Sequence, residues 1–170
     1  MYGLLLPGVR VYAFAMLESL KSAQRTLDEF CTDSQSSARI SGLAGLLAAC
    51  FRAGGKVLIC GNGGSLADAV HFAEELTGRF RDDRPALPAI AIAEPGHITC
   101  TANDYGFERI FSRAVEALGR EGDVLIALST SGNSANIVLA VEAARSRKMA
   151  TVALLGRGGG RLKGVCDHEI

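Results

Sequence analysis

The stretch KVLICGNGGS, residues 56–65, decides the fold, because it joins a short apolar run directly to a turn that contains three glycines. The run Val57-Leu58-Ile59 does not alternate with polar residues and includes β-branched members, which is typical of a strand buried on both faces of a parallel sheet. A helix is expected after the turn, to about Leu76. These residues therefore predict a strand followed by a turn and a helix.

The same order of elements repeats along the rest of the chain. Apolar runs and helical spacing predict strands at 89–93, 123–128, 150–155 and 165–170, and helices at 107–118 and 135–147. Strands and helices that alternate at this spacing predict an α/β fold, in which helices flank a parallel sheet of about five strands. The expected architecture is a Rossmann-like three-layer sandwich.

Two helices are expected ahead of the first strand, within residues 17–52. Apolar residues at three- and four-residue steps predict an amphipathic helix over 16–30, and the segment 40–51 is apolar on most sides, which predicts a buried helix. We expect both helices to pack in a subunit interface, since their apolar surface exceeds what one small sheet needs. Residues 1–16 lack a basic start and a clear cleavage site, so no signal peptide is predicted, and these residues are an extension if Met16 is the natural start.

Composition places the chain among globular proteins. Its 170 residues are 48% hydrophobic and 21% charged, which excludes a disordered or fibrous chain and fits a single domain over 1–170, with the sheet unit at 56–170. Eighteen basic residues balance eighteen acidic ones, so net charge favours neither nucleic acid nor membrane as a partner. The five cysteines are scattered, which favours a reduced, cytoplasmic location, and no apolar run is long enough to predict a transmembrane helix.

Two loops between a strand and a helix are candidate ligand sites, because ligands of parallel sheets bind beyond the carboxyl ends of the strands. In the first loop, the backbone of Gly63 and Gly64 can approach a ligand closely, and the helix start favours an anion. Asn62 and Ser65 are its polar side chains. The alternative is a tight turn in which Ser65 caps the helix.

The second loop carries four hydroxyls, from Ser129, Thr130, Ser131 and Ser134. Neutral donors at a positive helix end suit a phosphate dianion, whereas turns and a cap account for only one or two hydroxyls. The Walker lysine is absent, and the first loop does not have G-x-G-x-x-G spacing. A small sugar phosphate is therefore expected, and no nucleotide cofactor.

Three further places carry candidate side chains. His71 and Glu75 are four residues apart and share one helix face, so they can act on one ligand or one metal. A carboxylate that moves a proton beside a carbonyl needs no cofactor, which suits an aldose/ketose isomerase. Asn103 and Asp104 are candidates for sugar hydroxyls, or else form a turn or cap. The glycine-rich segment 156–161 is interpreted as a flexible loop with solvated arginines, although these could also meet an anion.

Five motifs together resemble the phosphoheptose isomerase family of the SIS (sugar isomerase) superfamily, over about residues 17–170. They are CGNGGS, DAVHFAEELTGRF, RPALPAIAI, TANDYGFERIFSR and GREGDVLIALSTSGNSANI. The two loops alone indicate a SIS domain, and HFAEELTGR together with NDYGF points to the heptose branch.

The resemblance implies a SIS fold and a cytoplasmic bacterial homotetramer. Such an enzyme converts D-sedoheptulose 7-phosphate into D-glycero-D-manno-heptose 7-phosphate for surface polysaccharides such as lipopolysaccharide. It also implies that Glu75 shuttles a proton between C1 and C2 through an enediol, and that His71 and Glu75 are two of four zinc ligands. The implied phosphate ligands are Ser129, Thr130, Ser131 and Ser134, and the implied sugar site is lined by Asn62, Gly63, Gly64, Ser65 and Asp104.

The family pattern continues beyond this chain, with a helix that carries a glutamine and a histidine of the metal site. The chain ends at Ile170, so we expect the chain as given to be poorly active and to bind metal weakly. Two alternatives remain open at this stage. One is a SIS-fold binding protein without catalysis, of the kind that associates with a replication initiator, and the other is a regulatory domain that senses a sugar phosphate.

Overall fold

The computed structural model describes residues 7–170, with side chains from residue 15 onward. The chain divides into two compact units, one up to Ile40 and one from Ser41 to Ile170. The interpretation of residues 1–16 as an extension falls in part outside the described residues. Where the chain is described, the first helix begins at Pro7 rather than near residue 16. Proline suits the first position of a helix, because its fixed φ is helical and its missing N–H has no partner there.

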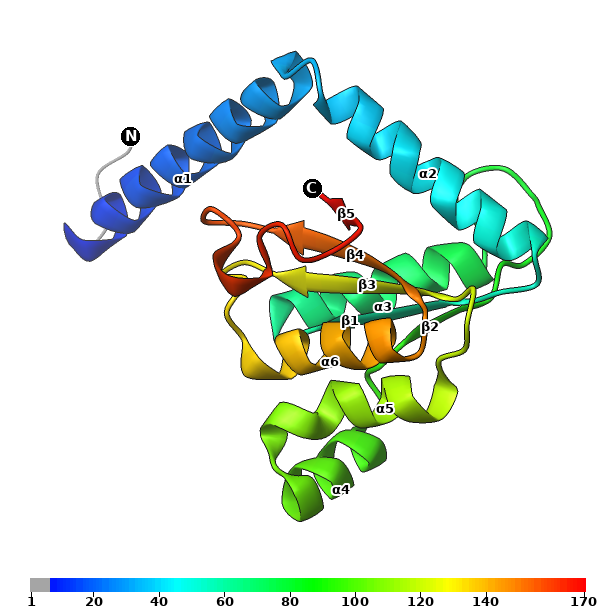
Figure 1. Cartoon of the computed structure of the whole chain (residues 1–170). Helices are drawn as coiled ribbons and strands as arrows, with labels where there is room; N and C mark the ends of the chain where they lie inside the picture. Colours follow the sequence, from blue (N-terminus) through cyan, green and yellow to red (C-terminus); the bar gives the residue numbers. More distant parts are fainter. Residues whose placement is uncertain (1–6) are drawn as a thin grey trace. The chain divides into compact units, whose positions relative to one another are not determined.

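The larger unit contains a fully parallel five-stranded sheet in the order β2-β1-β3-β4-β5 (Figure 1). Its strands are β1 (Val57–Gly61), β2 (Ala89–Ala91), β3 (Val124–Ser129), β4 (Ala150–Leu155) and β5 (His168–Glu169). The predicted α/β fold and strand count are confirmed. The last strand is shorter than predicted, because the N–H groups of Val165 and Cys166 bond to the Glu169 carboxylate instead of a neighbouring strand.

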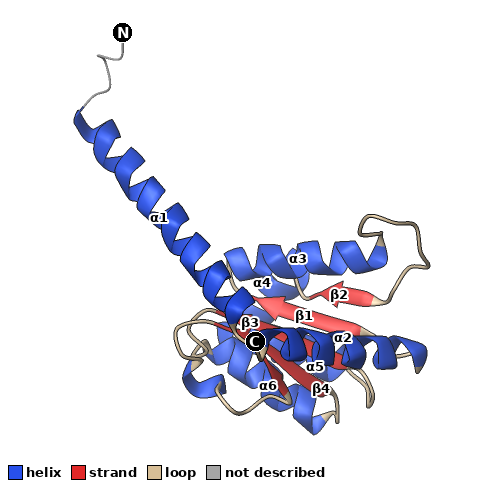
Figure 2. Ribbon diagram, turned by 90° about the horizontal axis from the view of Figure 1, so that it is seen from above, coloured by secondary structure: helices blue, strands red, loops and turns tan. Residues whose placement is uncertain are grey.

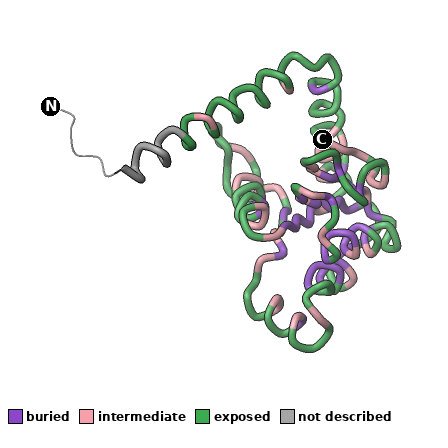
Figure 3. The backbone as a smooth tube through the Cα atoms, turned by 90° about the vertical axis from the view of Figure 1, so that its left-hand side faces the viewer, coloured by how far each residue is buried: buried purple, intermediate pink, exposed green. Residues whose placement is uncertain are grey.

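Helices cover both faces of the sheet and form two separate cores (Figure 2). On one face, α5 (Ile110–Leu118) and α6 (Ala135–Ser146) pack on the side chains of Leu58 and Leu125. On the other face, α2 (Ser36–Arg52) and α3 (Gly64–Thr77) pack on Ile59 and Ile126. Alternate residues of one strand therefore serve opposite cores, which explains why the strands read as continuous apolar runs. Every residue of β1 is buried, and buried residues gather in the interior of the larger unit in Figure 3.

The helix α4 (Pro95–Tyr105) was not predicted. Its start is nevertheless marked by Glu94, whose carboxylate accepts hydrogen bonds from the N–H groups of Gly96 and His97 and whose pKa these bonds lower. Proline at its first position is a second start signal. The predicted helix over 107–118 begins as a 3-10 turn, Phe107–Arg109, before α5.

The prediction of a buried helix at 40–51 is only half right. One face of α2 packs Leu46, Leu47 and Cys50 against the core, whereas Ala44 and Gly45 are exposed. Among the described residues, no helix combines the length and apolar character needed to cross a membrane.

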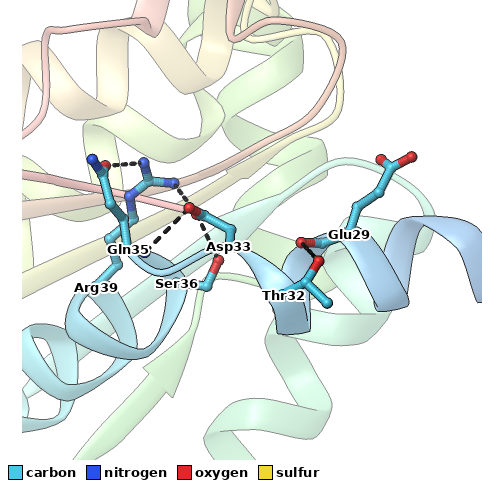
Figure 4. A network of polar contacts seen from close by, with 6 residues as sticks. All are labelled: Glu29, Thr32, Asp33, Gln35, Ser36 and Arg39. Atoms are coloured by element: carbon cyan, nitrogen blue, oxygen red, sulfur yellow. Dashed lines mark hydrogen bonds and ion pairs between the residues drawn. The ribbon is translucent and has the colours of Figure 1, made fainter.

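The smaller unit consists of α1 (Pro7–Thr32) and the first residues of α2, joined by a short polar turn (Figure 4). Asp33 accepts hydrogen bonds from the Gln35 N–H at 3.1 Å and the Ser36 hydroxyl at 2.9 Å. These two bonds, with a smaller contribution from the Arg39 guanidinium, lower the pKa of Asp33. Residues 33–35 thus form the turn between the end of α1 and the start of α2.

Candidate functional site

The candidate site lies at the carboxyl edge of the sheet, where β1 and β3 pair side by side. Their register places Gly61 opposite Leu128, so Asn62, which follows β1, lies beside Ser129, the last residue of β3. From β1 the chain continues to β2 on one side of this pair, and from β3 it continues to β4 on the other side. The direction in which strands are added to the sheet therefore reverses between β1 and β3. Such a switch point is where open parallel sheets bind ligands.

A cavity of 330 Å³ opens at this point. It is lined by Asn62, Ser65, Leu128, Ser129, Thr130, Ser131, Ser134 and Arg157. The structure thus brings together six of the side chains that the sequence singles out from its two ligand loops. Only the tertiary structure creates this cavity, because the two loops that line it are more than sixty residues apart in the chain.

The segment 129–134, here called the hydroxyl loop, is held open by its own side chains. The Ser129 Oγ accepts the Gly132 N–H at 3.1 Å, and the Ser131 Oγ accepts the Asn133 N–H at 3.2 Å. An oxygen that accepts such a bond still has its own O–H to donate. Ser134 is the N-cap of α6, yet its hydroxyl makes no capping bond. The turn interpretation and the ligand interpretation are therefore compatible, since the hydroxyl protons remain for an anion.

Asn62 also has a structural role that the sequence does not predict. Its amide exchanges two hydrogen bonds with the amide of Asn136, at 2.9 and 2.8 Å. Asn136 is 3% exposed and lies in the first turn of α6. This pair ties the loop after β1 to the helix that follows β3, so Asn62 holds the cavity wall as well as lining it. Asn136 was missed, although an asparagine just after the SGNS sequence was visible in the chain.

The first loop turns through Gly63, not through a serine cap. Gly63 is the N-cap of α3 with φ of 56° and ψ of −119°, a conformation that only glycine adopts readily. Ser65 therefore lies in the first turn of α3, and the alternative in which it caps the helix is wrong. Cys60, which precedes this loop, offers no nucleophile, because burial raises the pKa of its thiol to about 12.

His71 and Glu75 form a contact pair on α3, as the sequence predicted. The His71 Nε2 lies 3.2 Å from the Glu75 Oε1, and the two side chains are 72% and 30% exposed. Two ligands of a tetrahedral zinc ion with bonds of roughly 2.0–2.1 Å lie about 3.3 Å apart. The pair therefore fits a zinc ion, and its imidazole nitrogen and carboxylate oxygen are among the ligands that zinc takes.

Glu74 extends this cluster. One ligand atom from each of His71, Glu74 and Glu75 lies within 4.8 Å of the others. Gly63, His71 and Glu74 also border an open groove of 580 Å³ along α3. Neither His71 nor Glu75 lines the 330 Å³ cavity, so the structure does not join the proposed base to the hydroxyl loop within one chain.

Arg84 holds the end of α3 that carries Glu75. Its guanidinium donates to the main-chain oxygens of Glu75 and Leu76, at 2.5 and 2.9 Å. These carbonyls belong to the last turn of the helix, where a cation also interacts favourably with the helix dipole. Sequence reasoning missed this residue, because nothing in the local pattern shows that the chain folds back on α3.

Asn103 and Asp104 lie in the last turn of α4, not in an isolated turn ahead of residue 107. The Asn103 Nδ2 donates to Asp104 at 2.8 Å, and the Cys100 thiol donates to the other carboxylate oxygen at 3.5 Å. The bond to Asp104 raises the pKa of the Cys100 thiol. Neither Asn103 nor Asp104 is among the described residues that line the 330 Å³ cavity.

The sequence and the structure of this chain both match known proteins of one family. Residues 20–156 match the SIS domain family. A phosphoheptose isomerase from Edwardsiella ictaluri is 53% identical over 160 residues, which make up 94% of this chain and 83% of the relative. The solved phosphoheptose isomerase from Francisella tularensis is 38% identical, with a TM-score of 0.87 over 93% of this chain and 84% of its own.

The phosphoheptose isomerase from Neisseria gonorrhoeae is 40% identical, with a TM-score of 0.79 over 96% of this chain and 84% of its own. These matches extend across both ligand loops and α3. The chain belongs to the SIS domain family and, within it, to the phosphoheptose isomerases.

Proposed function

We propose that this protein is an isomerase that converts D-sedoheptulose 7-phosphate into D-glycero-D-manno-heptose 7-phosphate. The observation that carries this proposal is the hydroxyl-lined cavity at the switch point of the sheet, in a chain about half identical to phosphoheptose isomerases. The product supplies heptose for surface polysaccharides, lipopolysaccharide included. The five cysteines are all unpaired, which supports a cytoplasmic location.

The hydroxyl loop binds the 7-phosphate. Its O–H groups, the free hydroxyl of Ser134 and the N–H groups at the start of α6 are donors at the positive end of a helix dipole. The paired Asn62 and Asn136 amides tie the loop after β1 to α6, so the donors do not have to reorganise when the anion binds. Gly64, Asn103 and Asp104 are proposed to face the sugar.

Glu75 is the base. It removes a proton from C1 of the ketose to form an enediol and returns a proton to C2, while the O1 proton moves to O2, which yields the aldose. His71, at 3.2 Å, orients the carboxylate. Zinc, if bound, would be held by His71 and Glu75 and would polarise the carbonyl as a Lewis acid.

A homo-oligomer, proposed as a tetramer, resolves the separation between base and phosphate loop. Ser65 and Glu75 are ten residues apart on α3, which corresponds to about 15 Å along the helix. Neither His71 nor Glu75 lines the 330 Å³ cavity that contains the hydroxyl loop. Glu75 of one protomer is therefore proposed to act on a sugar whose phosphate lies in the hydroxyl loop of another. The apolar stripe of α1, with Leu20 63% and Leu27 61% exposed, supports assembly.

The alternatives without catalysis are less well supported. A binding protein or a sugar-phosphate sensor needs the hydroxyl loop but has no use for a carboxylate and imidazole paired at 3.2 Å. The high identity to named isomerases over 94% of the chain also favours the enzyme.

The test is isomerisation in D2O, followed by NMR. The expected result is formation of the aldose phosphate with deuterium at C2, because the enediol takes its proton from a base that exchanges with solvent. Sedoheptulose without phosphate is the matched control and is expected to react far more slowly. Absence of both product and deuterium exchange at C1 would contradict the proposed function.

A further inference from the structure

The segment 156–161, here called the arginine loop, packs against the hydroxyl loop instead of extending into solvent. Ser129 pairs with Leu155 at the ends of β3 and β4, so the two loops leave the sheet side by side. The Asn133 Oδ1 accepts the Arg161 N–H at 3.0 Å. A Cβ atom on Gly132, which has φ of 62°, would collide with the carbonyl oxygen of Gly159. The backbones of the two loops are thus in direct contact.

This packing places one arginine at the cavity. Arg157 is the only charged residue among the described residues that line the 330 Å³ cavity. The other polar groups there are hydroxyls and one amide, all of them neutral. A helix end contributes only about half a positive charge, which leaves most of the charge of a phosphate dianion unbalanced without Arg157.

The backbone at Arg157 is unfavourable for any residue with a side chain. Its φ is 46°, and Gly158, Gly159 and Gly160 after it also have positive φ. Glycine adopts this region without cost, whereas a side chain is strained there. Between Gly156 and Gly160, Arg157 is the one residue that has a side chain. A packing role does not explain that side chain, since Arg157 is exposed.

We propose that Arg157 is the cationic phosphate-binding residue of this site and that it makes the enzyme selective for sugars that carry a phosphate dianion. This assignment rests on the proposed function. Arg157 binds the phosphate together with the hydroxyls of the cavity, and its planar fork of donors matches two phosphate oxygens. It does not touch the reacting carbons, so it contributes to binding more than to turnover.

The test compares R157Q with R161Q in the full chain. Both changes remove one positive charge from the same loop, but only Arg157 lines the cavity. R157Q is expected to raise KM for sedoheptulose 7-phosphate about tenfold, which is the change in affinity expected when one hydrogen bond to a charged group is lost. The kcat is expected to stay within about twofold of the wild-type value. The inhibition constant of inorganic phosphate should rise by the same factor. R161Q is expected to change neither value by more than about twofold.

Two further variants separate charge from structure. R157G relieves the positive φ, so it should unfold at the same temperature as the wild type or a higher one, yet weaken phosphate inhibition as much as R157Q. R157K should recover part of the affinity, because it keeps the charge but not the fork. The difference between R157Q and the wild type should also shrink at high salt.

The outcomes distinguish this assignment from the proposed function. If the wild type isomerises the sugar phosphate and R157Q equals R161Q in KM and in phosphate inhibition, the assignment of Arg157 is wrong and the function stands. If the wild type does not isomerise it, but phosphate binding by calorimetry is still about tenfold weaker in R157Q than in R161Q, the function is wrong and the assignment stands.

Discussion

The Ser129 hydroxyl of the cavity can serve two partners at once. Ser129, which is 5% exposed, accepts a hydrogen bond from the backbone of its own loop and keeps its proton for a ligand. Ser134 makes no such internal bond and is available as a whole. Loss of Ser129 therefore removes a phosphate donor and also leaves the N–H of Gly132 without its side-chain acceptor.

The double variant S129A/S134A is expected to raise KM for the sugar phosphate by about tenfold or more, since two donors to an anion are lost. Steady-state kinetics provides the measurement. S146A is the control, because the Ser146 hydroxyl bonds only to the Glu142 carbonyl near the far end of α6. An unchanged KM in the double variant would show that the phosphate binds elsewhere.

The variant E75Q keeps the shape of the side chain but removes the base. Turnover is expected to fall by about 10² to 10⁴, while KM stays near the wild-type value. H71A should lose a comparable amount only if the pair holds a metal, and zinc should then restore chelated wild type but not H71A. Wild-type turnover in E75Q would mean that another group is the base.

At the scale of secondary-structure elements, Asp123, which immediately precedes β3, binds Lys56, which immediately precedes β1. Its carboxylate accepts hydrogen bonds from the Lys56 N–H at 2.9 Å, the Lys56 ammonium at 2.5 Å and the Arg120 N–H at 2.8 Å. Burial by itself would raise the pKa of Asp123, but these hydrogen bonds outweigh it and lower the pKa. This carboxylate stabilises the side-by-side start of β1 and β3, on which the cavity at their other end depends.

The variant D123N is expected to lower the free energy of unfolding by about 1–3 kcal/mol at pH 7. A lowered folded-state pKa stabilises the protein above the unfolded pKa, and this contribution is lost as pH falls through the folded value. The difference between D123N and wild type should therefore shrink below about pH 4. Urea unfolding at pH 7, at pH 5, at pH 4 and just below pH 4 measures this difference in the free energy of unfolding.

The matched control for that experiment is E121Q. Glu121 pairs with Lys148 at 3.2 Å, but both side chains are more than two thirds exposed. Such a surface pair contributes about 0–1 kcal/mol. Equal losses in D123N and E121Q at pH 7 would contradict the role assigned to Asp123.

Secondary structure was predicted well from apolar stretches of the sequence and poorly from polar ones. The strand at 150–155 has the predicted bounds, because its apolar run ends abruptly at Gly156. The helix α4 was missed because it contains glycine, threonine and asparagine, which have weak helix propensity. Its stability comes from the cap at Glu94 and from packing of Ile98 and Ala102 on the core.

At the scale of the whole molecule, the proposed base Glu75 does not line the cavity of the hydroxyl loop within one chain. At a sugar phosphate concentration well below KM, where S129A/S134A alone is about tenfold less active than wild type, a 1:1 mixture of E75Q and S129A/S134A is therefore expected to reach about a quarter of wild-type activity after joint refolding, since mixed oligomers contain intact sites. A mixture of E75Q and H71A should show no more activity than the two variants show separately, because both changes lie on α3.

Sedimentation must show that the variants in each mixture assemble together. Co-assembly of E75Q with S129A/S134A without any regain of activity would mean that one chain provides the whole site. A stable monomer of the wild type at micromolar concentration would also contradict the proposed oligomer.

The sequence by itself determined the strands of this protein, the two ligand loops and the pairing of His71 with Glu75. All of these depend on residues that are near one another in the chain, where apolar runs, glycine turns and helical spacing are sufficient. Only the tertiary structure decided the strand order β2-β1-β3-β4-β5. That order joined Asn62 to Asn136 and placed Arg157 beside the hydroxyl loop. These contacts link residues far apart in sequence, and no local pattern encodes which strands become neighbours.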